Sequence, residues 1–201
     1  MRTAVLIPAL NEGDVIKEVI EQSTRACPGA RVFVVDGGSV DGTPALARAA
    51  GATVVVQRGT GYAAGLASGY EALLQTGFDR LVQLDADGQH PPDMAGVLLD
   101  ALGPANWVIG SRAGTRSPGP LSRRVGSLLL GAVTQVAARQ RFGDVTSGFW
   151  ALDPVAVRCL LPELQSGLAD ANLRVHGARQ GLVISEHAVT MRARLCMRPV
   201  T

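Results

Sequence analysis

The sequence contains almost no lysine, since Lys17 is the single lysine among 19 basic residues. The other basic side chains are arginines, whose planar guanidinium groups bind carboxylates and phosphates through paired hydrogen bonds. A GC-rich genome would produce the same bias. The arginine excess is therefore compatible with an anionic ligand but does not establish one.

Cysteine is also scarce, with Cys27, Cys159 and Cys196 as the only three in 201 residues. Their number is odd and their spacing matches no metal-binding pattern, which argues against a disulfide framework and against a metal held by cysteines. A reduced, cytoplasmic environment is the simplest interpretation.

Long apolar runs are missing as well. The run within residues 1–8 is too short for a signal peptide, and no small-residue cleavage site follows it. The longest later run, residues 125–138, contains Ser127, Thr134 and Gln135 and is too short to cross a bilayer. We expect a cytoplasmic protein that is soluble or attached peripherally to the inner face of a membrane.

The length and the hydrophobic content of 47% suffice for one domain with a closed core. No internal repeat or linker divides residues 1–201. Charge is distributed unevenly, because residues 1–110 carry 12 acidic and 7 basic side chains, whereas residues 111–201 carry 5 acidic and 12 basic ones. The first half therefore suits a cation, and the second suits a phosphate or an anionic membrane surface.

Short runs rich in β-branched residues alternate with helical patterns. This alternation predicts βαβ units and an α/β fold with a mostly parallel central sheet. Asn11, with Asp14 three residues later, is a candidate cap for the first helix, and Thr43 before Pro44 for the second. The predicted strands are residues 3–7, 31–35, 53–56, 80–84, 107–110 and 182–190, and the predicted helices are residues 14–25, 44–50, 63–76 and 93–102.

Polar segments follow three of the predicted strands, at residues 8–12, 36–43 and 85–90. In open α/β sheets, ligands bind outside the carboxyl ends of the strands. Asp85 and Asp87 are two residues apart after a buried strand, so their carboxylates face one side. Such a pair favours a shared cation, and hard oxygen ligands suit Mg2+ or Mn2+; Gln89 adds a third candidate oxygen.

Other residues near these strand ends allow more than one role. Asp36 ends the second strand and can accept a hydrogen bond from a nucleotide base. Glu12 is either a helix-start carboxylate or a ribose contact, and Asp41 before Gly42 fits a turn first and a ligand contact second. The glycine-rich segment 59–65 precedes a helix and can approach a phosphate. It follows the third strand rather than the first, which argues against a dinucleotide-binding dehydrogenase.

Five motifs follow one another along the chain. They are Pro8-Ala9-Leu10-Asn11-Glu12, Val35-Asp36-Gly37-Gly38-Ser39-Val40-Asp41-Gly42-Thr43, Asp85-Ala86-Asp87-Gly88-Gln89-His90-Pro91, Gly110-Ser111-Arg112 and Thr146-Ser147-Gly148-Phe149. In this order they resemble the motif set of family 2 glycosyltransferases, and the match runs over nearly the whole chain. The similarity is greatest to the branch that contains dolichol-phosphate mannose synthase and bacterial polyprenyl-phosphate glycosyltransferases.

The resemblance implies a GT-A fold, a sugar-nucleotide donor such as a GDP- or UDP-sugar, a divalent metal, and inversion at the anomeric carbon. It implies that residues 1–110 hold the donor and metal and that residues 111–201 hold the acceptor. The metal is assigned to Asp85, Asp87 and Gln89, with Asp87 also catalytic. The donor is assigned to Pro8, Ala9, Asn11, Glu12, Asp36, Gly38, Gly59, Gly61, Asp85 and Ala86.

Three positions depart from the family pattern. Gly37 stands where a second aspartate is usual, Thr60 where a lysine is common, and Trp150 where an arginine often follows the Ser-Gly-Phe motif. These departures bear on the identity of the donor more than on the fold.

The acceptor half contains Arg123 and Arg124 ahead of an apolar run. The resemblance suggests an interfacial helix that brings Arg112, Arg123 and Arg124 to a lipid phosphate, because basic groups beside an apolar helix suit an anionic headgroup. An ordinary amphipathic core helix with solvated arginines is nearly as good an interpretation.

Asp170 lies where many relatives carry an acidic residue before a helix. It is either the general base that a hydroxyl acceptor needs or a helix cap. A phosphate acceptor is already an anion and needs no base. The sequence thus predicts a metal-dependent hexosyltransferase acting on a polyprenyl phosphate, with no nucleic-acid partner and with an oligomer allowed.

Two alternatives remain at this point, and a third is disfavoured. The same donor site could serve a soluble hydroxyl acceptor with Asp170 as base, or the chain could bind a nucleotide sugar without catalysis. A sugar-nucleotide pyrophosphorylase would need a basic, glycine-rich loop directly after the first strand, and residues 8–13 do not provide it.

Overall fold

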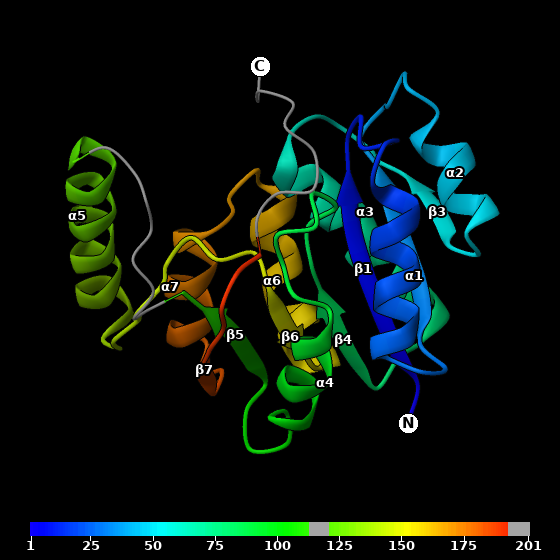
Figure 1. Ribbon diagram of the computed structural model, residues 1–201. Helices are drawn as coiled ribbons and strands as arrows, with labels where there is room; N and C mark the ends of the chain where they lie inside the picture. The colour runs from blue at the N-terminus through cyan, green and yellow to red at the C-terminus, as the bar shows by residue number, and fades with distance from the viewer. Residues whose placement is uncertain (113–120, 193–201) are drawn as a thin grey trace.

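The computed structural model describes residues 1–112 and 121–192, and in residues 121–128 it describes the backbone alone. A seven-stranded sheet forms the centre, in the order β3-β2-β1-β4-β6-β5-β7 (Figure 1). The β1–β2, β2–β3, β1–β4 and β5–β7 pairs are parallel, and β6 runs antiparallel to both β4 and β5. The strands are β1 (Thr3–Ala9), β2 (Arg31–Asp36), β3 (Thr53–Val56), β4 (Arg80–Gln83), β5 (Trp107–Ser111), β6 (Trp150–Leu152) and β7 (Ile184–Ala188).

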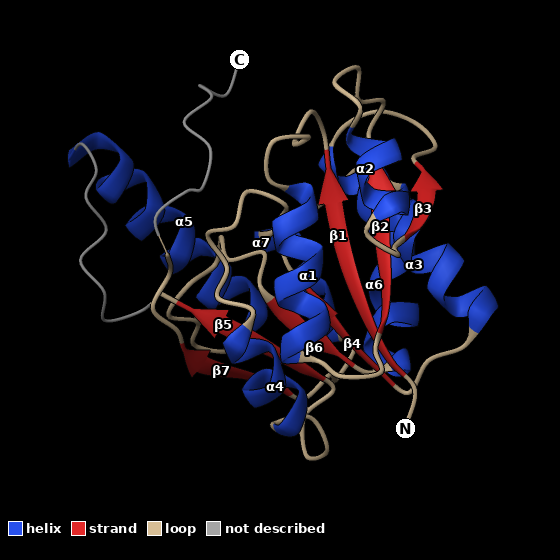
Figure 2. Ribbon diagram, turned by 45° about the vertical axis from the view of Figure 1, so that its right-hand side comes forward, coloured by secondary structure: helices blue, strands red, loops and turns tan. Residues whose placement is uncertain are grey.

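Helices cover both faces of this sheet (Figure 2). Helices α1, α2 and α4 pack on one face, α3, α6 and α7 pack on the other, and α5 packs against α7 at the edge of the molecule. The helices are α1 (Ile16–Ala26), α2 (Thr43–Ala49), α3 (Tyr62–Thr76), α4 (Asp93–Asp100), α5 (Leu121–Ala138), α6 (Pro154–Gln165) and α7 (Ala171–Arg179).

The period-two alternation of β1 supplies both cores. Val5 and Ile7 point into the core beneath α1 and α4, whereas Ala4 and Leu6 point into the core beneath α3. From Ala4 to Ala9 the strand is apolar at every position, as expected of a strand covered on both faces. The predicted α/β class and mostly parallel sheet are therefore confirmed.

Three elements were not expected from the sequence. Strand β6 has only three residues, too few for a detectable alternation. Helix α6 begins where the Asp153 carboxylate accepts a hydrogen bond from the backbone N–H of Ala156 at 2.7 Å, with Pro154 in the first turn. For helix α7, the sequence offered only Asp170, an acidic residue that precedes a helix in many relatives. The last strand is also shorter than predicted, ending at Ala188.

Both predicted helix caps are wrong. Helix α1 begins after Val15 without a side-chain cap, and Asn11 has a positive φ of 55° within the preceding loop. Helix α2 begins after Gly42, whose φ of 86° suits glycine, so Thr43 lies inside the helix. The Thr43 hydroxyl instead donates to Asp41 at 2.5 Å. Among the described residues, no helix has both the length and the apolar character needed to cross a membrane.

Candidate functional site

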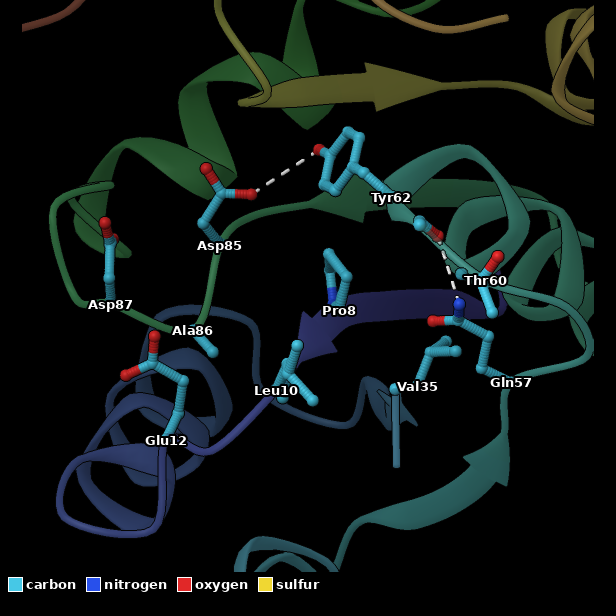
Figure 3. A pocket seen from close by; sticks show the side chains of 14 residues that line it. Pro8, Leu10, Glu12, Val35, Gln57, Thr60, Tyr62, Asp85, Ala86 and Asp87 are labelled. Atoms are coloured by element: carbon cyan, nitrogen blue, oxygen red, sulfur yellow. Dashed lines mark hydrogen bonds between the residues drawn. The ribbon is translucent and has the colours of Figure 1, made fainter. Parts of the chain in front are cut away.

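A cleft of about 750 Å³ lies at the carboxyl ends of the parallel strands (Figure 3). Pro8 of β1 lies at its centre, with residues 85–87 after β4 on one side and Tyr62 at the start of α3 on the other. Ala9 and Gly61 also line it. This is the position in which an open α/β sheet binds its ligand.

Asp85 is positioned by His90 as well as by the strand before it. The backbone N–H of Asp85 donates to Nδ1 of His90 at 2.8 Å, which leaves the ring proton on Nε2, 3.6 Å from the Asp85 carboxylate. Burial lowers the pKa of His90 to about 4, so the ring is neutral near pH 7. The imidazole also stacks on Phe149 at 5.1 Å between ring centroids.

A chain of hydrogen bonds connects the Asp85 carboxylate to the protein interior. The hydroxyl of Tyr70 donates to Oε1 of Gln83 at 2.9 Å, and Nε2 of Gln83 donates to the Tyr62 hydroxyl at 3.4 Å. That hydroxyl in turn lies 3.5 Å from Oδ1 of Asp85, toward which it points in Figure 3. Burial and the negative charge of Asp85 raise the pKa of Tyr62, so the phenol stays protonated and acts as a donor.

Glycine at position 148 keeps this arrangement open. A Cβ there would lie 3.0 Å from the Tyr62 hydroxyl and 3.4 Å from both carboxylate oxygens of Asp85. Gly148 also accepts a hydrogen bond on its carbonyl from Nε2 of Gln83 at 3.2 Å. Neither Tyr62 nor Gln83 could be assigned a role from the sequence, because their importance depends on contacts between segments far apart in the chain.

The donor set at this wall fits a hard divalent cation. Asp85 and Asp87 both line the cleft, and oxygen ligands are those that Mg2+ and Mn2+ prefer. Asp87 also accepts the backbone N–H of Gln89 at 3.0 Å, whereas the Gln89 side chain is exposed and does not line the cleft. Within the described ranges, no three His, Cys, Asp or Glu side chains gather into a complete metal site. A metal here would need oxygens from a donor diphosphate.

The predicted donor residues divide into two groups. Pro8, Ala9, Glu12, Gly61, Asp85 and Ala86 line the cleft, whereas Asn11, Asp36, Gly38 and Gly59 do not.

Two of the residues outside the cleft organise its loops. The Asp36 side chain, only 6% exposed, accepts backbone N–H groups of Gly38 and Ser39 at 3.2–3.3 Å. Asn11 accepts the N–H of Val40 at 2.9 Å.

Just after β5, Arg112 is held by Asp144. Its Nε and Nη2 donate to the two carboxylate oxygens at 2.6 and 2.9 Å, and Nη2 also donates to the Thr146 hydroxyl at 2.7 Å. These bonds to Arg112 hold the pKa of Asp144 at about 2, against the opposing effect of its burial. Arg123 and Arg124 belong to α5, but their side chains lie outside the described residues.

Asp170 precedes α7 with a backbone conformation unusual for a residue with a side chain, φ 52° and ψ −116°. Asp170 occupies the N-cap position of α7, but its side chain makes no capping hydrogen bond. Burial, aided by the charge of Asp85 and opposed by that of Arg174, raises the pKa of Asp170. Strained backbone at an acidic residue facing the charge of Asp85 is typical of a functional position.

Arg174 is the largest charged side chain in the core and is fully buried. Its guanidinium lies 5.7 Å from the ring of Trp107 and 5.6 Å from that of Trp150, and Nη2 donates to the Ser147 carbonyl at 2.9 Å. Burial lowers its pKa to about 10, so it remains charged at neutral pH. The arginine thus fixes the loop that carries Gly148, with Trp150 as one of its stacking partners.

Several glycosyltransferases are similar to this chain in sequence. Glycosyltransferase AglJ of Haloferax volcanii is 37% identical over 73% of this chain and 48% of its own length. The polyprenol monophosphomannose synthase of Mycolicibacterium smegmatis is 35% identical over 75% of this chain and 61% of its own. The undecaprenyl-phosphate mannosyltransferase of Micrococcus luteus is 32% identical, over 80% and 70% respectively.

Solved structures share the fold. Glucosyl-3-phosphoglycerate synthase from Mycobacterium tuberculosis, crystallised with Mn2+, UDP and glucosyl-3-phosphoglycerate, superposes with a TM-score of 0.68 at 23% identity. The match covers 98% of this chain and 73% of that one. The arrangement described above is thus the GT-A fold. The model of the family "Glycosyl transferase family 2" matches residues 4–161, and the chain belongs to that family.

Proposed function

We propose that the chain transfers a sugar from a nucleotide-sugar donor to a polyprenyl phosphate, with inversion at the anomeric carbon. The observation that carries this proposal is the cleft itself. Two carboxylates at the end of β4 face the glycine-rich start of α3 across a space open to the β1 strand end. Similarity to two polyprenyl-phosphate mannosyltransferases supports the lipid acceptor.

The residues of the cleft have different roles in binding the donor and in breaking its sugar–phosphate bond. Asp85 and Asp87 hold a divalent metal, which when bound would withdraw charge from the departing nucleoside diphosphate. Backbone groups at Gly61 let the diphosphate approach the N-terminus of α3, whose dipole favours an anion. The hydroxyl of Tyr62 donates to the Asp85 carboxylate, and His90 accepts the backbone N–H of Asp85, so both residues help to hold Asp85 at the cleft.

The acceptor phosphate in this proposal is bound by arginines. It is ionised at neutral pH, so it can attack the anomeric carbon without a base. Arg123 and Arg124 offset its repulsion from the donor phosphates and hold it in line. Arg112 is the third arginine of this proposal, and its orientation is fixed by Asp144. Peripheral contact of α5 with a membrane at the inner face would present the lipid to them.

A second candidate uses the same donor site with a soluble hydroxyl acceptor. Asp170 favours this candidate, because its raised pKa and its strained backbone are expected of a general base. The bonds of Arg112 to Asp144 and Thr146 also reduce the charge that it can offer to a phosphate.

Transfer assays with matched variants separate the two candidates. Purified chain with Mn2+ is given UDP- or GDP-sugars and either a short-chain polyprenyl phosphate or a soluble alcohol. The lipid proposal expects Arg123→Ala/Arg124→Ala to lose lipid glycosylation while donor binding persists, and Asp170→Asn to retain it. If the alcohol is glycosylated and the lipid ignored, and Asp170→Asn abolishes transfer, the second candidate is correct.

A further inference from the structure

Gln57 is the first residue after β3, and its side chain enters the cleft close to the end of β2 (Figure 3). Its backbone N–H donates to the Asp36 carbonyl at 3.0 Å, which continues the pairing of β3 with β2 by one residue. The side chain therefore projects from a fixed point of the sheet rather than from a free loop.

The orientation of the Gln57 amide is fixed by two bonds. Its Nε2 donates to the carbonyl of Gly59 at 3.1 Å and to that of Gly61 at 3.0 Å, so both amide protons are used. An amide turned the other way would place an oxygen against two carbonyl oxygens, which is repulsive. Oε1 must therefore be the atom that faces the cleft.

Two glycines leave space around this oxygen. A Cβ at Gly37 would lie 3.3 Å from Oε1 of Gln57, and a Cβ at Gly65 would lie 2.9 Å from it. Both glycines line the cleft. Among the residues that the structure describes, no hydrogen-bond donor to Oε1 is recorded. The oxygen is thus an oriented acceptor at the base of a ligand cleft.

Asp36 is poorly placed for the same task. It is 6% exposed, does not line the cleft, and accepts backbone N–H groups from its own loop. The loop after β2 contributes Gly37 instead of a second carboxylate at the cleft surface. The oriented acceptor in this part of the cleft is therefore the Gln57 amide.

We propose that Gln57 reads the nucleobase of the donor by accepting a hydrogen bond on Oε1 from a ring imino N–H. Uracil, thymine and guanine carry such a donor between two ring substituents, whereas cytosine and adenine present a lone pair at the corresponding ring nitrogen. A site with a fixed acceptor favours the first group and repels the second. The proposal rests on the proposed function, since it assumes that the cleft binds a nucleoside diphosphate.

The test measures binding rather than transfer. Titration calorimetry with Mn2+ compares UDP, dTDP and GDP with CDP and ADP on the full chain. For whichever binds, the matched analogue methylated at the imino nitrogen, N3-methyl-UDP, N3-methyl-dTDP or N1-methyl-GDP, is then titrated. We expect the wild type to bind the parent about tenfold more tightly than the methylated analogue, the usual worth of one oriented hydrogen bond.

The substitution Gln57→Met keeps a similar volume and removes the acceptor. It should bring the ratio of the two affinities close to one. Gln57→Met also removes the hydrogen bonds to the Gly59 and Gly61 carbonyls, and the altered loop can weaken the binding of both ligands. That effect does not change the ratio of the two affinities. Gln180→Ala, a distant exposed glutamine, is the control and should keep the full ratio.

The outcomes that would overturn the inference are distinct. Three results would reject Gln57 as the residue that recognises the base while leaving a nucleotide site intact. CDP or ADP could bind as tightly as the other nucleotides, or Gln57→Met could keep the affinity ratio of parent to methylated analogue. The third is loss of that ratio in Asp36→Ala but not in Gln57→Met. Failure of every nucleoside diphosphate to bind with Mn2+ or Mg2+ would reject the proposed function and this inference together.

Discussion

The backbone N–H of Asp85 donates a hydrogen bond to Nδ1 of His90 at 2.8 Å, and His90 is only 6% exposed. Replacing the ring by His90→Leu would leave that N–H buried without an acceptor. We expect a loss of about 1–3 kcal/mol in the free energy of unfolding. His90→Asn, which keeps an acceptor close to the position of Nδ1, should recover part of this loss.

Chemical denaturation measures the effect, and slow donor hydrolysis reports on Asp85 in the same samples. His176→Ala is a suitable comparison, because His176 pairs with Glu163 at 2.9 Å near the surface, far from the cleft. An unfolding free energy for His90→Leu equal to that of wild type would show that His90 does not hold the Asp85 backbone.

A second prediction concerns the hydroxyl of Tyr62. Tyr62→Phe removes the donor to Asp85 and the acceptor for Gln83 but keeps the ring that lines the cleft. We expect kcat for sugar transfer to fall about 3- to 10-fold, with little change in Tm, since the hydroxyl lies at the cleft. Gly148→Ala should reduce turnover further, because its Cβ would press on the hydroxyl from 3.0 Å.

Steady-state kinetics with thermal unfolding on the same preparations test this pair. Gly96→Ala is a matched control, because a Cβ at that helical glycine meets no atom within 4 Å. Wild-type kcat in both Tyr62→Phe and Gly148→Ala would mean that the hydrogen-bond chain from Tyr70 has no part in the reaction.

Sequence alone predicted the parts of the site that are local. The strand before Asp85 and the two-residue spacing to Asp87 specify a pair of carboxylates at a strand end, and both line the cleft. The roles of Tyr62 and Gln57 could not be predicted in this way. Tyr62 depends on its contacts with Asp85 and Gln83, 23 and 21 residues further along the chain. Gln57 depends on the space that Gly37, after another strand, leaves beside its amide oxygen.

The same distinction explains the errors in the fold. Asn11 is a residue type that often caps helices, but two tertiary bonds hold it in a loop instead. Its backbone N–H donates to the Ser39 hydroxyl, and its side chain accepts the N–H of Val40. Strand β6 is held between β4 and β5 by neighbours on both sides, so three residues suffice. Such an element leaves almost no periodic signal in the sequence.

The pair of Arg112 and Asp144 predicts a pH dependence of stability. The pKa of Asp144 is lowered to about 2 in the folded chain, whereas an aspartate in the unfolded chain has a pKa of about 4. The pair therefore stabilises the fold fully above the unfolded-state pKa and loses this effect as pH falls toward 2. The contribution is about 2 kcal/mol. The difference in unfolding free energy between wild type and Asp144→Asn should therefore be constant from pH 5 to 7 and shrink below about pH 4. A difference that does not change with pH would contradict the ionic pair.

The last prediction concerns Asp87, which lines the cleft two residues after Asp85. Two ionised carboxylates at one wall repel each other, and a divalent cation bound between them and a donor diphosphate relieves that repulsion. Asp87→Asn keeps the shape of the side chain but removes one negative charge. It should abolish sugar transfer while the fold survives, because the apolar strand before it, not the carboxylate, holds the segment in place.

In thermal unfolding, wild type should gain stability only when Mn2+ and a nucleoside diphosphate are present together, since each completes the site of the other. Asp87→Asn should lose that joint gain, whereas Asp100→Asn, at an exposed pair with Arg80, should keep it. Transfer by Asp87→Asn at a rate near that of wild type, or an undiminished joint stabilisation, would exclude a metal held by these two aspartates.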